Sequence, residues 1–179
     1  FIGSFGDDSI DGNGSDDNSW VGYWLLDDSD DFNGLDIDLA AGSAHGLDSN
    51  GDPTVFTDTL TGIEHAWGSV FDDSILGDVD NNELGGEEGD DTLKGGEGYD
   101  TLIGLEGDDS LDGGDFSGNN PRNYADYSYD PAGIDLEIRY NGDNDDSFDG
   151  SQANDGWSDI DTIENISRII GSSYNDQII

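Results

Sequence analysis

The stretch from Gly68 to Asp112 divides into five consecutive nonapeptides: GSVFDDSIL (68–76), GDVDNNELG (77–85), GEEGDDTLK (86–94), GGEGYDTLI (95–103) and GLEGDDSLD (104–112). Each unit begins with glycine. The sixth position holds Asp73, Asn82, Asp91, Asp100 and Asp109, and the eighth holds Ile75, Leu84, Leu93, Leu102 and Leu111. Three features in phase over five units predict a repeat architecture.

A nine-residue unit of this kind reads as about six turn residues followed by a strand of three residues. A strand that short is stable only when units stack, so each strand is expected to pair with the strand two units later and to bury its eighth-position side chain. The sixth-position carboxylates then also stack, about 4.8 Å apart, and repel one another unless a divalent cation lies between turns. Carboxylate and carbonyl oxygens from flexible Gly-rich turns suit Ca²⁺ better than Mg²⁺.

These nonapeptides resemble the repeats-in-toxin (RTX), or hemolysin-type, calcium-binding family. The resemblance implies an all-β fold, a right-handed parallel β-roll (a β-solenoid) with several Ca²⁺ ions between its turns, and secretion by a type I machine. It also implies carboxylate ligands at Asp73, Asp91, Asp100 and Asp109, with carbonyl ligands near Gly89, Gly98 and Gly107. Asn82 departs from the pattern and brings no charge, so its site is expected to be weaker or absent.

The unit recurs near both ends of the chain. GSFGDDSID (3–11) places Asp8 and Ile10 in phase, and the next unit keeps Asp17 but has serine in place of the apolar residue. GSSYNDQII (171–179) places Asp176 and Ile178 in phase. Asp8, Asp17 and Asp176 are therefore further candidate calcium ligands.

Two segments between the repeats are related to each other. The stretch 58–76 aligns without gaps with 161–179, an offset of 161 − 58 = 103 residues, and 34–42 aligns with 133–141 at an offset of 99. We therefore expect two related irregular β inserts that interrupt the roll. The expected organisation is short roll coils at 1–19, the first β insert at 20–67, the central roll at 68–119, the second β insert at 120–170, and the start of a further coil at 171–179.

Composition excludes several classes of function. The 179 residues include 4 Lys and Arg against 44 Asp and Glu, a formal net charge of −40. This charge repels phosphate backbones, and no apolar stretch is long enough to span a bilayer, so nucleic-acid binding and membrane insertion are not expected. There is no cysteine, so neither disulfides nor thiolate metal sites hold the fold. Without counter-cations we expect the chain to be unfolded.

Other polar and aromatic residues leave alternatives open. The acidic loops 27–31 and 143–149 are either extra calcium sites or solvated loops. Trp20 and Trp24 are the best candidates for a ligand site, against a core or capping role for the tryptophans, and Trp67 aligns with Ile170 in a buried pattern. Neither histidine is set beside a nucleophile, and no zinc motif is present, so the chain is not expected to be an enzyme.

The sequence thus predicts a calcium-binding β-roll segment of a larger secreted protein, extracellular or at the cell surface. It is expected to fold on calcium outside the cell and to act as a structural spacer or stabiliser. The absence of Met and of a signal-peptide pattern suggests a processed piece or an internal segment. One alternative is a subunit that assembles end to end into an adhesive filament or surface layer. Another is an accessory module of a secreted enzyme, with Trp20 and Trp24 contacting an extracellular polysaccharide.

Overall fold

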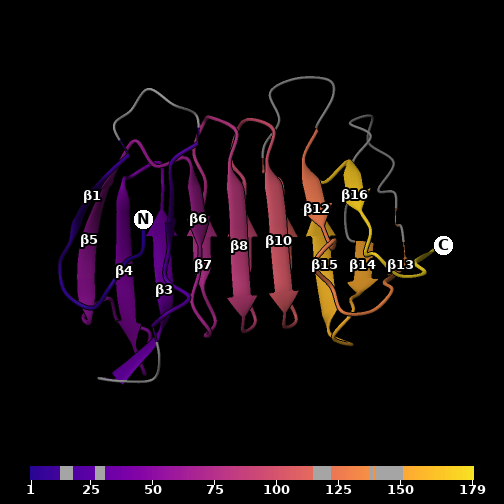
Figure 1. Cartoon of the computed structure of the whole chain (residues 1–179), viewed down its shortest axis with the longest axis horizontal. Coiled ribbons are helices and arrows are strands. Elements are labelled where there is room, and N and C mark those ends of the chain that lie inside the picture. Colours follow the sequence, from indigo (N-terminus) through magenta and orange to yellow (C-terminus); the bar gives the residue numbers. More distant parts are fainter. Residues whose placement is uncertain (13–17, 27–30, 115–121, 138, 140–150) are drawn as a thin grey trace.

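The protein is an all-β roll of two long sheets. The computed structural model describes residues 1–12, 18–26, 31–114, 122–137, 139 and 151–179, whose strands lie in one eleven-stranded and one six-stranded sheet (Figure 1). In the part of the chain that is described, no helix has the length and apolar character needed to cross a membrane.

The nonapeptides form the middle of the roll. Their strands, together with β6 (His65–Trp67) just before Gly68, alternate between the two sheets in chain order. Strands β6, β8 (Glu83–Glu88) and β10 (Thr101–Glu106) lie in the six-stranded sheet, and β7 (Ser74–Leu76), β9 (Thr92–Lys94) and β11 (Ser110–Asp112) lie in the other. From β6 to β9, each strand pairs in parallel with the one eighteen residues later, as Ser74 does with Thr92 and Thr92 with Ser110. The predicted stacking of every second unit is confirmed.

The eighth-position residues form the core of the roll. Ile75, Leu84, Leu93, Leu102 and Leu111 are each at most 1% exposed and belong to one continuous apolar cluster. Because Leu84 and Leu102 come from one sheet and the other three from the facing sheet, the two sheets close on each other through this apolar ladder. The apolar period of nine residues therefore sets the register of both sheets.

The two inserts continue the larger sheet and are more regular than expected. In the first insert, β3 (Phe32–Asp38), β4 (Ser43–Asp48) and β5 (Phe56–Thr61) form an antiparallel meander. In the second, β13 (Asp135–Glu137), β14 (Ser151–Asn154) and β15 (Ile160–Glu164) repeat it. The meanders join the roll through parallel pairs: β5 with β1 (Ser9–Asp11), β3 with β7, β15 with β11, and β13 with β17 (Gln177–Ile178).

The six-stranded sheet shows the same duplication. Here β2 (Trp20–Gly22) pairs with β6, and β12 (Tyr124–Asp126) pairs with β16 (Arg168–Ile170). The backbone N–H of Tyr23 donates to the carbonyl of Trp67, and that of Tyr127 to the carbonyl of Ile170, at 3.1 and 2.8 Å. The two copies are thus related strand by strand. The five-segment division stays a prediction, because the inserts and the nonapeptides share sheets and one core.

Candidate metal centre

Sixth-position aspartates form a ladder along one edge of the roll. The backbone N–H of Asp73 donates to Oδ1 of Asp91 at 2.7 Å, and that of Asp91 donates to Oδ1 of Asp109 at 2.9 Å. The N–H of Asp109 continues the ladder to Oδ1 of Asp161 at 3.0 Å, across the second insert. In each pair, one oxygen of the carboxylate that comes later in the chain therefore joins two successive coils.

The opposite edge carries a ladder of different chemistry. The N–H of Asn82 donates to Oδ1 of Asp100, and the N–H of Asp100 donates to Oδ1 of Asn123, both at 2.9 Å. Asp100 is thus a single carboxylate between two side-chain amides. The charge that accumulates along this edge is smaller than along the first.

Among the described residues, the second oxygens of four ladder carboxylates have no hydrogen-bond partner. Oδ2 of Asp91, Asp100, Asp109 and Asp161 is buried without a hydrogen bond, and these residues are 2%, 0%, 2% and 1% exposed. Burial, together with the charge of Asp73, raises the pKa of Asp91 to about 9. Burial also raises the pKa of Asp100 and of Asp109 to about 7. A buried carboxylate left in this state requires either a proton or a cation.

In the three nonapeptides, the bare oxygen faces the first glycine of its own unit. A Cβ atom on Gly86 would lie 2.0 Å from Oδ2 of Asp91 and 2.9 Å from the carbonyl oxygen of Gly104. A Cβ atom on Gly104 would lie 2.0 Å from Oδ2 of Asp109, and one on Gly95 would lie 2.4 Å from Oδ2 of Asp100. Glycine is required here for space. We call this space the glycine cradle. In each case a carboxylate oxygen lies against it, and at Gly86 a carbonyl oxygen does as well.

Serine takes the place of a counter-charge in three other units. Ser69 donates its backbone N–H and its hydroxyl to the carboxylate of Asp73. The hydroxyl of Ser172 donates to Asp176 at 2.7 Å, and that of Ser4 donates to Asp8 at 3.0 Å. Asp8 and Asp176 are moreover exposed in the outer coils. These three predicted ligands are therefore partnered within the chain, whereas Asp17 lies outside the described residues.

In two coils, asparagine takes the place of the ladder aspartate, and its amide nitrogen donates hydrogen bonds to carbonyl groups. Nδ2 of Asn123 lies in the cradle of Gly113 and donates to the carbonyls of Gly113 and Asn165, at 2.7 and 3.3 Å. Nδ2 of Asn82 donates to the carbonyl of Glu64 at 2.8 Å. An amide therefore binds the same kind of carbonyl oxygen that a cation would bind, which explains how these coils close without one.

The turn glycines bring successive coils into close approach. Gly89, Gly98 and Gly107 have φ of +116°, +116° and +147°, a region that favours glycine. A Cβ atom on Gly107 would lie 1.9 Å from the carbonyl oxygen of Gly89. Metal binding by these three carbonyl groups stays a prediction.

The donor set fits an oxygen-seeking cation held partly by the backbone. Among the described residues no three Asp, Glu or His side chains gather into a metal cluster. An ion here would thus need carbonyl oxygens beside its carboxylates, which the cradles offer and which Ca²⁺ accepts. The acidic loops at 27–31 and 143–149 lie, apart from Asp31, outside the described residues.

Two members of the ladders could not be identified from the nine-residue period, because they lie after the regular repeats. Asn123 and Asp161 enter the ladders 23 and 52 residues after the residues that they bond. The alignment of Asp161 with Asp58 could have revealed its role, since the N–H of Asp8 donates to Asp58 in the first copy at 2.8 Å. No comparable sequence signal marks Asn123.

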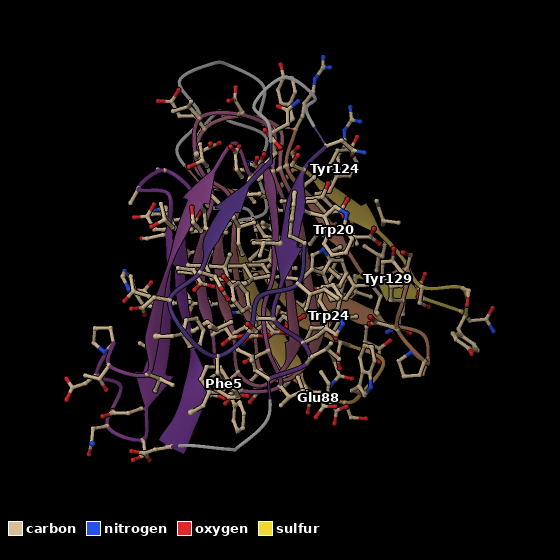
Figure 2. The ribbon with its side chains drawn as sticks, turned by 60° about the vertical axis from the view of Figure 1, so that its left-hand side comes forward. Phe5, Trp20, Trp24, Glu88, Tyr124 and Tyr129 are labelled. Atoms are coloured by element: carbon tan, nitrogen blue, oxygen red, sulfur yellow. The ribbon has the colours of Figure 1, made fainter. Side chains whose placement is uncertain are left out.

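Three of the four tryptophans, Trp20, Trp24 and Trp67, lie on the outer face of the six-stranded sheet rather than in the core. The rings of Trp20 and Trp24 stack with centroids 5.5 Å apart, and both project from the same side of the roll (Figure 2). Trp67, for which a buried position was expected, is only half-buried and lines a hollow beside them. The predicted burial of Trp67 is wrong because Ala66, the middle residue of β6, points into the core, so its neighbour Trp67 points to the outer face.

Comparison with protein families agrees with this geometry. The model of the RTX calcium-binding nonapeptide repeat matches residues 1–22, 58–93 and 85–118, with four copies. The last two ranges contain Asp91, Asp100 and Asp109. Among curated proteins, no match was found.

Proposed function

We propose that this chain is a calcium-gated folding and spacing segment of a secreted protein. The chain carries RTX calcium-binding nonapeptide repeats. One observation supports the proposal above the others. Three buried carboxylate oxygens, on Asp91, Asp100 and Asp109, have no hydrogen-bond donor among the described residues and face the glycine cradles. A cation is the partner that suits buried carboxylates of this kind.

We assign one Ca²⁺ ion to each of these three carboxylates. Asp91 with the Gly104 carbonyl gives the best-defined pair of oxygens, and Asp109 and Asp100 repeat the carboxylate half of it. Asp73, Asp8, Asp176 and Asn82 are hydrogen-bonded within the chain, so we expect them to contribute less to affinity. The carbonyls of Gly89, Gly98 and Gly107 are proposed to complete the coordination from the turns.

Calcium would then control folding through linkage. The ions bind the stacked coils and not the extended chain, so their binding free energy adds to the free energy of folding. At low calcium the net charge of −40 opposes compaction, and at higher calcium each ion offsets repulsion between coils. RTX proteins are typically secreted, and this coupling would keep the chain unfolded before export and folded outside the cell.

The contrast between Asn123 and the aspartates gives a gain-of-site test. In Asn123→Asp, the amide donor in the cradle of Gly113 is replaced by an oxygen that faces the Gly113 and Asn165 carbonyls. Titration calorimetry is expected to count one more Ca²⁺ ion than in the unchanged protein, and folding should require more calcium. Asn50→Asp, which adds the same charge at an exposed position, is the matched control. An unchanged ion count in Asn123→Asp would contradict the cradle as the calcium site.

A second candidate function is end-to-end assembly. At one end of the six-stranded sheet, β16 leaves Ile170 38% exposed. In the described residues β17 pairs with β13 alone, so one of its edges is open. Stacking of a second copy on this edge is the structural route to a filament.

A further inference from the structure

We infer that the outer face of the six-stranded sheet carries a binding site for a glycan of neutral pyranose rings. The site is a hollow of about 480 Å³, which is within the usual size of ligand pockets. It is lined by Asn18, Trp20, Trp24, His65, Trp67, Glu83 and Glu87. This inference does not depend on the calcium proposal, because none of these residues belongs to the aspartate ladders.

Two glycines let indole rings lie against the sheet. In the register of β2, β6 and β8, Gly22 and Gly85 flank Trp67 on its two neighbouring strands. A Cβ atom on Gly22 would lie 1.6 Å from the Trp24 ring, and one on Gly85 would lie 2.5 Å from the Trp67 ring. The two rings therefore occupy the space of absent side chains. Trp20, 42% exposed, stacks on Trp24 and extends the aromatic surface.

The second copy of the repeat shows that the fold does not require these tryptophans. The positions of Trp20 and Trp67 are taken there by Tyr124 and Ile170, on strands with the same pairing, and that of Trp24 by Ser128, in the turn that follows. In place of His65 the second copy has Arg168, whose guanidinium carbon lies 5.4 Å from the centre of the Tyr124 ring. That aromatic face is covered from within the chain. Trp20 is on the same side of the roll as Tyr124 (Figure 2).

The polar groups of the hollow suit hydroxyl groups. Nδ1 of His65 accepts a hydrogen bond from the backbone N–H of Glu83 at 2.9 Å, so the neutral ring carries its proton on Nε2 and can donate. Asn18 can both donate and accept, and the carboxylates of Glu83 and Glu87 accept. Sugar hydroxyls are both donors and acceptors, and pyranose rings present apolar C–H faces that pack on indoles.

Charge narrows the class of glycan. The lining contains two carboxylates and no Lys or Arg, and the whole chain has a net charge of −40. Uronic, sialylated and sulfated glycans would be repelled. The hollow therefore fits uncharged hexose or N-acetylhexosamine polymers.

The test uses substitutions that the second copy already accommodates. Trp67→Ile and Trp24→Ser are compared with Trp157→Ala, which removes the fourth tryptophan, outside the hollow. Binding of glucose, mannose and N-acetylglucosamine hexasaccharides is measured by calorimetry on the full chain in calcium, with oligogalacturonate as the acidic probe. We expect one of the neutral series to bind, with affinity about tenfold weaker or more in Trp67→Ile and Trp24→Ser and unchanged in Trp157→Ala.

Failure to bind any of the three neutral hexasaccharides would overturn the inference. So would equal loss in all three variants, or a preference for oligogalacturonate. Circular dichroism of each variant in calcium and in chelator checks the fold separately, so that a loss of glycan binding is distinguished from a failure of the calcium-dependent fold.

Discussion

Asp91→Ala is expected to lower the free energy of unfolding in saturating calcium by about 3 kcal/mol or more. The substitution removes the proposed ligand at the centre of the first edge. It also removes the hydrogen-bond acceptor of the buried backbone N–H of Asp73. In the unchanged protein this N–H donates to Oδ1 of Asp91 at 2.7 Å. Chemical denaturation followed by circular dichroism gives the change. Asp90→Ala, which removes the exposed neighbouring carboxylate, is expected to cost about 1 kcal/mol or less.

Asp91→Asn separates the ligand role from the hydrogen-bonding role. Its Oδ1 can still accept from Asp73, while its Nδ2 can donate in the cradle as Asn123 does. We therefore expect one Ca²⁺ ion fewer, together with a fold that is less destabilised by chelator than that of the unchanged protein. If Asp91→Asn bound the same number of ions, Asp91 would not be a calcium ligand.

Gly86→Ala is expected to prevent calcium-dependent closure of the central coils. The added methyl group would lie 2.0 Å from Oδ2 of Asp91 and 2.9 Å from the Gly104 carbonyl, so both a ligand and the backbone of the next coil must move. We expect a loss of about 3 kcal/mol or more in calcium-saturated stability. The measurement is a denaturant titration at saturating calcium.

Gly51→Ala is the control for this substitution. Gly51 lies in open space with φ of +78°, so alanine there should cost only backbone strain, about 1 kcal/mol. Equal effects of the two substitutions would show that the space at Gly86 has no special role. The space at Gly86 would also have no special role if Gly86→Ala and the unchanged protein folded at the same calcium concentration.

The parts of the structure that follow from a nine-residue period could be predicted from sequence. The burial of Leu93 and Leu102, the parallel pairing at eighteen residues and the stacking of Asp73, Asp91 and Asp109 are local consequences of one repeated unit. The duplicated inserts were also visible, because two offsets near 100 residues relate them. Their strands, however, are placed by pairing with coils that are distant in sequence, such as β13 with β17.

The chemistry of individual sites was less predictable because it depends on atoms that the repeat does not specify. Asp73 and Asp91 occupy the same position of the repeat, yet only Asp73 is bonded to a serine, Ser69, at the second position of its unit. Serine occupies this second position in three units, and in each of them it is bonded to the sixth-position aspartate. Once one such bond is known, the sequence predicts the others. The site on the outer face depends on Gly22 and Gly85, which leave space for the indole rings. This role could not be predicted without the register of the three strands β2, β6 and β8.

The most direct test of calcium-gated folding is a calcium titration of chelated protein, with circular dichroism and light scattering recorded together and magnesium as the control. The account predicts a cooperative gain of β signal with calcium alone. A concurrent rise in scattering would favour end-to-end assembly, and constant scattering would favour a monomeric spacer. A protein already folded in chelator, or one folded equally well by magnesium, would contradict calcium as the partner of Asp91, Asp100 and Asp109.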